Sequence, residues 1–286
     1  MGNPAGRPAA RPAGRSVAVP AAGEAADHLV WRSTTVDGRR AHYGVAGEGL
    51  PVLFLHGWAL GQHAYKRALK RLVHRGCQVF APSMPGFGGT ADLPAEALTL
   101  AGYAEWVAGF LDAVGVTGEV LTIGHSFGGG VAVQLAHDYP DLVNSLVLVN
   151  SVGGATWMQA GTTVRSMAER PLWDWGLHFP GDLLTVRTVG GVLRSVMEDA
   201  LPNLLCNPLA LWRAGQLARR ADLTAELRTL KERRLPVLVL WGDQDTLIPR
   251  ASFEAICAAL GSNGEVVHGR HSWLLADPDT FGEVLA

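Results

Sequence analysis

Short apolar runs alternate along the chain with segments that have one apolar and one polar face. The runs with the length and composition of buried β-strands are 51–55, 77–81, 119–124, 145–150, 236–241 and 265–268. The segments with helical periodicity are 63–75, 99–114, 127–139, 251–260 and 277–285. Near the start, residues 29–36 and 39–46 flank Asp37-Gly38, a typical two-residue hairpin turn. This order predicts an α/β fold with a mostly parallel central sheet flanked by helices.

The alternation stops in residues 152–232, where helical pieces are separated by Gly and Pro and no convincing strand occurs. It resumes after that interval. We therefore expect one α/β core, formed by residues 27–151 and 233–286, that is interrupted by a helical insertion at 152–232. Residues 1–26 are rich in Ala, Pro, Gly and Arg and contain no continuous apolar stretch. They predict a flexible tail and not a secretory signal.

The composition excludes several classes of protein. Hydrophobic residues make up 48% of the chain, which is enough for a sizeable core and excludes wholesale disorder. A net charge of −2 gives no electrostatic case for binding nucleic acid or an anionic membrane surface. No apolar run reaches the roughly 18 residues that a membrane span needs. We expect a small-molecule partner, and the sequence leaves open whether the protein forms a homodimer.

Three cysteines, Cys77, Cys206 and Cys257, lie far apart in the chain. They form no CxxC motif or Cys/His cluster, so the sequence indicates neither a disulfide framework nor a zinc site. We expect buried free thiols in a reducing compartment, the cytoplasm. No metal or organic cofactor is indicated.

The sequence Gly124-His125-Ser126-Phe127-Gly128 fits the pattern G-x-S-x-G. It lies between an expected strand and an expected helix, which is where this pattern exposes a serine hydroxyl on a sharp turn. Glycine on both sides permits the close backbone packing that such a turn requires. Ser126 is therefore the candidate nucleophile.

A serine hydroxyl needs a base to accept its proton, and the base needs a carboxylate to orient it. His271 lies beyond the last expected strand and is the favoured base, whereas His268 falls at the end of that strand. Two carboxylates follow the strand 236–241. Asp243 suits a turn residue that caps backbone N–H groups, and Asp245 lies further into the loop. We favour Asp245 as the acid.

The oxyanion of an acyl-transfer reaction needs hydrogen-bond donors that are already in place. We expect one from the backbone N–H of Phe127 and the other from the N–H of Trp58, in the loop after an earlier strand. His56 is expected to organise that loop through hydrogen bonds. With Gly57 and His125, it completes the expected pocket around the nucleophile.

Four motifs in this order resemble the α/β-hydrolase superfamily over roughly residues 30–286. Residues 56–58 resemble its HG-x oxyanion loop, 124–128 match its nucleophile elbow, and 269–271 stand where it has Gly-x-His. Residues 242–249 resemble its G-x-x-D-x-x-[IV]-P acid loop, which places the acid at Asp245. The resemblance implies that the insertion 152–232 is a helical cap.

One position departs from the pattern of the superfamily. Ser83 stands where the loop D-x-x-G-x-G-x-S has Asp, which puts the geometry of that loop in doubt more than the chemistry. The insertion contains aromatic residues, of which Trp157, Trp173 and Trp175 are candidates for an apolar substrate pocket.

The residues predict a serine hydrolase that cleaves a carboxylic ester with an apolar acyl or alcohol part through an acyl-enzyme. The resemblance keeps other reactions of the same triad open: carbon–carbon bond cleavage of dienoic ring-fission products, thioester hydrolysis, perhydrolase or haloperoxidase chemistry, and lyase chemistry. A non-catalytic ligand-binding role on the same fold is a third alternative, because fold does not dictate function.

Overall fold

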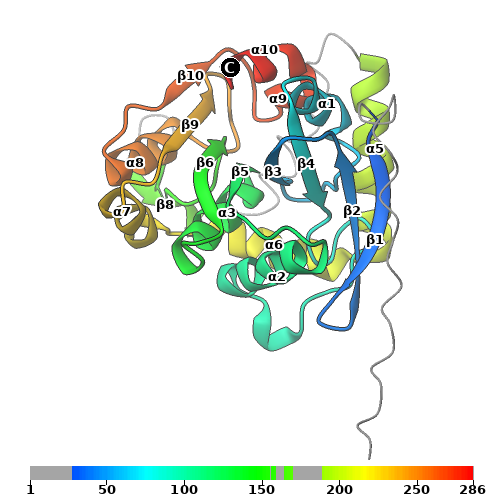
Figure 1. Cartoon of the computed structure of the whole chain (residues 1–286). Helices are drawn as coiled ribbons and strands as arrows, with labels where there is room; N and C mark the ends of the chain where they lie inside the picture. The colour runs from blue at the N-terminus through cyan, green and yellow to red at the C-terminus, as the bar shows by residue number, and fades with distance from the viewer. Residues whose placement is uncertain (1–27, 155, 159–163, 170–188, 286) are drawn as a thin grey trace, which may run out of the picture.

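The computed structural model describes residues 28–154, 156–158, 164–169 and 189–285 (Figure 1). Its centre is an eight-stranded sheet with the order β1-β2-β4-β3-β5-β6-β9-β10. The strands are β1 Val30–Val36, β2 Arg39–Ala46, β3 Leu50–Leu55, β4 Cys77–Pro82, β5 Val120–His125, β6 Val143–Val149, β9 Val237–Gly242 and β10 Glu265–Val267.

The sheet is parallel from β4 to β10, and only β1 and β2 run antiparallel to their neighbours. Asp37 and Gly38 join β1 to β2 with φ of 48° and 74°, the conformation that a tight hairpin turn requires. The predicted α/β class, parallel sheet and N-terminal hairpin are confirmed.

Helices cover both faces of the sheet (Figure 1). Their bounds are α1 Lys66–His74, α2 Leu100–Ala113, α3 Phe127–Asp138, α5 Val189–Cys206, α6 Pro208–Arg220, α7 Thr224–Glu232, α8 Arg250–Leu260, α9 Trp273–Ala276 and α10 Pro278–Val284, with short 3₁₀ turns at Ala95–Ala97 and Met167–Glu169. One apolar core lies under α2, α3, α7 and α8, and the other lies under α1, α9 and α10. The central strands β3, β4, β5, β6 and β9 are mostly buried between the two layers and are therefore apolar runs, whereas most of β1 is exposed.

Two expectations were wrong in detail. The interval 152–232 was expected to contain no strand, yet β7 Thr156–Met158 and β8 Val164–Ser166 form an antiparallel pair there. Strands of three residues are too short for a recognisable periodicity. Cys77 and Cys257 are buried free thiols as predicted, but Cys206 is exposed because it ends α5 on the outer surface. Within the described ranges, no helix is both long and apolar enough to cross a membrane.

Candidate active site

The predicted site residues gather where the parallel strands end. Trp58 follows β3, Ser126 follows β5, Asp245 follows β9 and His271 follows β10. In a parallel sheet the carboxyl ends of all strands meet at one edge, so segments far apart in the sequence become neighbours.

Ser126 occupies the turn between β5 and α3 with φ 54° and ψ −117°. This backbone conformation costs a residue other than Gly about 1–3 kcal/mol and persists only where the surroundings enforce it. The two flanking glycines show how the turn is enforced. A Cβ on Gly124 would lie 2.5 Å from the carbonyl oxygen of Gly128, and one on Gly128 would lie 2.3 Å from that of Leu55. Neither glycine could therefore carry a side chain, because Gly124 is packed against α3 and Gly128 against the end of β3.

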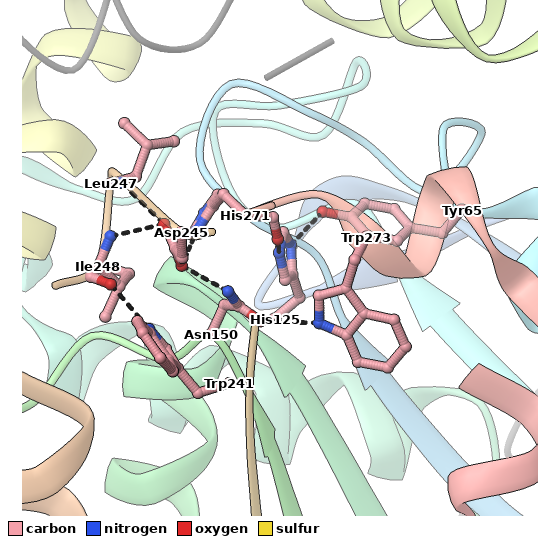
Figure 2. A network of polar contacts seen from close by, with 9 residues as sticks. All are labelled: Tyr65, His125, Asn150, Trp241, Asp245, Leu247, Ile248, His271 and Trp273. Atoms are coloured by element: carbon pink, nitrogen blue, oxygen red, sulfur yellow. Dashed lines mark hydrogen bonds and ion pairs between the residues drawn. The ribbon is translucent and has the colours of Figure 1, made fainter. Parts of the chain in front are cut away.

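Asp245 holds the imidazole of His271. The His271 Nδ1–H donates to Asp245 Oδ2 at 2.8 Å, and both side chains are buried (Figure 2). Asp245 Oδ1 accepts the backbone N–H groups of Leu247 and Ile248 at 2.7 and 2.9 Å. Because Nδ1 carries the donated proton, Nε2 is the basic nitrogen of His271.

Asn150, at the end of β6, is a further partner of this carboxylate. Its Nδ2 donates to Asp245 Oδ2, and its Oδ1 accepts the indole N–H of Trp273 at 2.8 Å (Figure 2). Asp245 thus accepts hydrogen bonds from four donors, which fixes its orientation and satisfies both oxygens. The sequence placed Asn150 at a strand end but gave no signal for this role.

The competing residues form a separate pair. The Asp243 carboxylate interacts with His268 Nδ1 at 3.1 Å and accepts the backbone N–H of Gly269 at 2.9 Å. The Gly269 N–H and the His268 side chain lower the pKa of Asp243 below its ordinary value. Asp243 therefore caps the loop after β10, the turn role that the sequence suggested for it.

The loop after β3 is organised by His56. Its Nδ1–H donates to the Gly57 carbonyl at 2.9 Å, and its Nε2 accepts the N–H of Met84 at 2.8 Å. Burial lowers the pKa of His56 to about 4, so the ring is neutral at pH 7. The next residue, Trp58, donates its indole N–H to the Leu211 carbonyl of α6 at 2.7 Å, which joins this loop to the insertion.

His125 and Tyr65 extend the network. The Tyr65 hydroxyl accepts the N–H of Gly57 at 2.9 Å and donates to His125 Nδ1 at 2.7 Å. The Nε2–H of His125 donates to the backbone carbonyl of His271 at 3.0 Å. Burial lowers the pKa of His125 well below its ordinary value and raises that of Tyr65. No sequence pattern pointed to Tyr65, which lies just before α1.

Backbone hydrogen bonds hold the loop that contains Ser83. Ser83 is fully buried, and its hydroxyl has no hydrogen-bond partner among the described residues. Its backbone N–H donates to the His42 carbonyl at 2.9 Å, and His56 holds the next residue, Met84. Nearby, the buried Asp199 of α5 accepts the N–H groups of Gly61 and Ala64 at 3.1 and 2.7 Å.

A pocket opens over the serine. Its described lining residues are Gly57, Trp58, Leu60, His125, Ser126, Leu247, Ile248, His271 and Ser272. The predicted nucleophile and base thus line one pocket together with Gly57, Trp58 and His125. His56 was also expected to line it, but its side chain is fully buried and is not among the lining residues, because it holds the backbone of the loop. Trp173, Trp175 and the side chain of Trp157 lie outside the described residues. No group of three or more His, Cys, Asp or Glu side chains that could hold a metal occurs in the described part of the chain.

Residues 51–187 match the family model described as the α/β hydrolase fold. The chain has the α/β-hydrolase fold. This α/β-hydrolase is similar to a Mycobacterium phage D29 protein described as a candidate non-heme haloperoxidase, with 27% identity over 87% of this chain and 91% of the relative.

Two solved structures share the fold of this α/β-hydrolase. A serine hydrolase involved in carbazole degradation has a TM-score of 0.72 and 22% identity over 90% of this chain and 97% of its own. The esterase RhEst1 from Rhodococcus sp. ECU1013 has a TM-score of 0.69 and 24% identity over 89% of this chain and 96% of its own.

Proposed function

We propose that this α/β-hydrolase is a serine hydrolase that cleaves a carboxylic ester with an apolar acyl or alcohol part. The observation that carries the proposal is that Ser126 and His271 line one pocket while Asp245 holds His271 from behind. That arrangement supplies a nucleophile, a base and a group that fixes the tautomer of the base.

In the proposed reaction, Ser126 Oγ attacks the ester carbonyl carbon while His271 Nε2 takes the hydroxyl proton. The imidazolium that forms is stabilised by the Asp245 carboxylate. His271 then returns the proton to the leaving alcohol as the carbon–oxygen bond breaks, which leaves an acyl-enzyme. A water molecule, activated by the same imidazole, attacks the acyl carbon and releases the acid and Ser126.

The backbone N–H groups of Phe127 and Trp58 are assigned as the donors that stabilise the negative charge on the carbonyl oxygen. Phe127 begins α3, and the first N–H groups of a helix have no partner within that helix. Trp58 lines the pocket and lies on the loop that His56 and Tyr65 support. One such donor contributes about 3–4 kcal/mol of transition-state stabilisation.

The pocket lining favours an ester over the alternatives. Its described residues include Leu60, Leu247 and Ile248, and none of the described lining residues is Arg or Lys. A dienoic ring-fission product carries a carboxylate that calls for a cationic partner. Cleavage of ring-fission products is therefore the less supported alternative, and haloperoxidase chemistry, suggested by the phage relative, is a second candidate for the same triad.

The domain arrangement belongs to the same proposal. The proposed cap is the insertion at 152–232, and the bond from Trp58 to Leu211 supports contact between its described part and the site. The predicted tail, residues 1–26, lies outside the described residues. The free thiols of Cys77, Cys206 and Cys257 support a reducing compartment such as the cytoplasm.

Replacement of the nucleophile tests the function. Ser126→Ala should lower p-nitrophenyl ester turnover by about 10⁶-fold and abolish covalent labelling by a fluorophosphonate, while the circular dichroism spectrum is unchanged. Ser145→Ala, which removes a hydroxyl far from the pocket, serves as the control and should keep both activities. Turnover or labelling that survives in Ser126→Ala would show that another residue is the nucleophile.

A further inference from the structure

We propose that Tyr65 and His125 are positioning residues that hold the oxyanion loop and the His271 loop in register through one continuous chain of hydrogen bonds. The inference rests on the proposed function and assigns it two further residues. The chain runs from the Gly57 N–H through the Tyr65 hydroxyl and the His125 ring to the His271 carbonyl.

Every link in this chain has one possible direction. The Gly57 amide can only donate, so Tyr65 Oη accepts from it and is left with its own proton for His125 Nδ1. The His271 carbonyl can only accept, so His125 must carry its proton on Nε2. Figure 2 shows the Tyr65 hydroxyl directed at the His125 ring.

The chain leaves His125 no capacity to act as a base, because both ring nitrogens are committed. Burial and the nearby His271 lower its pKa, which agrees with a ring that remains neutral. Tyr65 is fully buried, and a charged partner for it would be costly there. The pair is therefore a rigid neutral spacer and not a second proton relay.

The positions of the links explain what the spacer does. Gly57 precedes Trp58, the proposed oxyanion donor, and His125 precedes Ser126. The last link is the backbone of the base itself. Space at the first link is also restricted, since a Cβ on Gly57 would lie 2.8 Å from His125 Nδ1 and 3.0 Å from Tyr65 Oη. One chain thus connects the three segments whose relative positions set the reaction geometry.

The kinetics of a variant that lacks the Tyr65 hydroxyl test the proposal. Tyr65→Phe should lower kcat for a p-nitrophenyl ester by about tenfold to a hundredfold with KM changed less than about twofold, because a displaced donor affects the transition state more than binding. Tyr103→Phe is the matched control. It removes another buried hydroxyl, which donates to the Pro85 carbonyl at 3.2 Å, and should keep wild-type kcat.

Variants at His125 test whether the pair acts as a unit. His125→Leu should lose about as much kcat as Tyr65→Phe, and the double variant should lose little more, because either change breaks the same chain. His125→Gln should recover part of the loss, since its amide N–H can reach the His271 carbonyl. Wild-type kcat in Tyr65→Phe, or losses that multiply in the double variant, would overturn the proposal.

A measurement that needs no turnover separates this inference from the proposed function. Two-bond ¹H–¹⁵N NMR spectra of the wild type should show His125 as the neutral Nε2–H tautomer, with a shift of the Nδ1 resonance in Tyr65→Phe and none in Tyr103→Phe. A His125 ring protonated on Nδ1 would overturn the chain. A wild type that shows this tautomer but hydrolyses no ester would instead overturn the proposed function.

Discussion

Two His–Asp pairs lie at the same end of the sheet. In the sequence, their histidines are three residues apart and their aspartates are two residues apart. His271 and Asp245 are 2.8 Å apart with 6% and 0% of their side chains exposed. His268 and Asp243 are 3.1 Å apart with 82% and 42% exposed. The chemical groups are the same, so pairing with an aspartate does not by itself distinguish the proposed base, His271, from His268.

Burial and additional donors make the difference. Water screens the exposed pair, and such pairs contribute at most about 1 kcal/mol. Around Asp245, three further donors fix the carboxylate in one orientation, and the low local dielectric strengthens each hydrogen bond. Asp243 accepts one backbone N–H and holds a loop. The buried pair can keep an imidazole aimed at the pocket, while the exposed pair stabilises a turn.

Removing the imidazole of His271 and that of His268 in separate variants should give the largest difference between the two pairs. His271→Ala should lower kcat for a p-nitrophenyl ester by about 10⁴–10⁶-fold, because the serine loses its base. His268→Ala should keep kcat within about twofold, since its ring lies outside the pocket. Steady-state kinetics at pH 8 measure both. A large loss in His268→Ala would reverse the assignment of the two pairs.

His56 shows the effect of burial on an imidazole that has no carboxylate partner among the described residues. His56 is fully buried but is held by backbone groups and no carboxylate. Its pKa in the folded protein is about 4, against about 6.5 in the unfolded chain. As the pH falls from 6.5 to 4, the unfolded state binds a proton that the folded state does not. Stability is therefore full above pH 6.5 and is lost toward pH 4.

This difference predicts a loss of about 3 kcal/mol in the free energy of unfolding across that range from His56 alone. Urea unfolding measures the free energy of unfolding at pH 7 and at pH 4. Its decrease between the two pH values should be smaller in His56→Gln than in the wild type by about this amount. His268→Gln, which removes an exposed imidazole, should keep the wild-type pH dependence. An equal loss in His56→Gln and the wild type would show that His56 is charged in the folded protein.

Local patterns predicted most of the fold because they are set by burial. The strand expected at 119–124 is observed as Val120–His125, and the Asp37-Gly38 turn lies where expected. The strands β7 and β8 were missed because three residues carry too little periodicity. The exposure of Cys206 depends on which face of α5 packs inward, which its composition does not reveal.

The sequence identified groups at strand ends but not the contacts that orient them. His271 and Asp245 could be chosen over their neighbours from position and motif. In the sequence, Tyr65 is part of an expected amphipathic helical segment. Its hydroxyl contacts His125, which is 60 residues away in the chain, only because of the tertiary fold. Likewise, nothing local indicates that Asp199 of α5 holds the turn at Gly61.

Asn150 offers the finest test of why the two pairs differ, because the exposed pair has no counterpart to it. Its amide donates to the same Asp245 oxygen that holds His271 and is itself fixed by the Trp273 indole. Asn150→Ala should lower kcat about tenfold, as Asp245 keeps its other three donors but loses one restraint. The free energy of unfolding should fall by about 1–3 kcal/mol, since the Trp273 N–H is left buried without a partner. Asn144→Ala, at the start of the same strand β6, is the control and should leave kcat unchanged. Wild-type kcat in Asn150→Ala would mean that burial and backbone donors alone distinguish the proposed catalytic pair, His271 and Asp245, from the pair formed by His268 and Asp243.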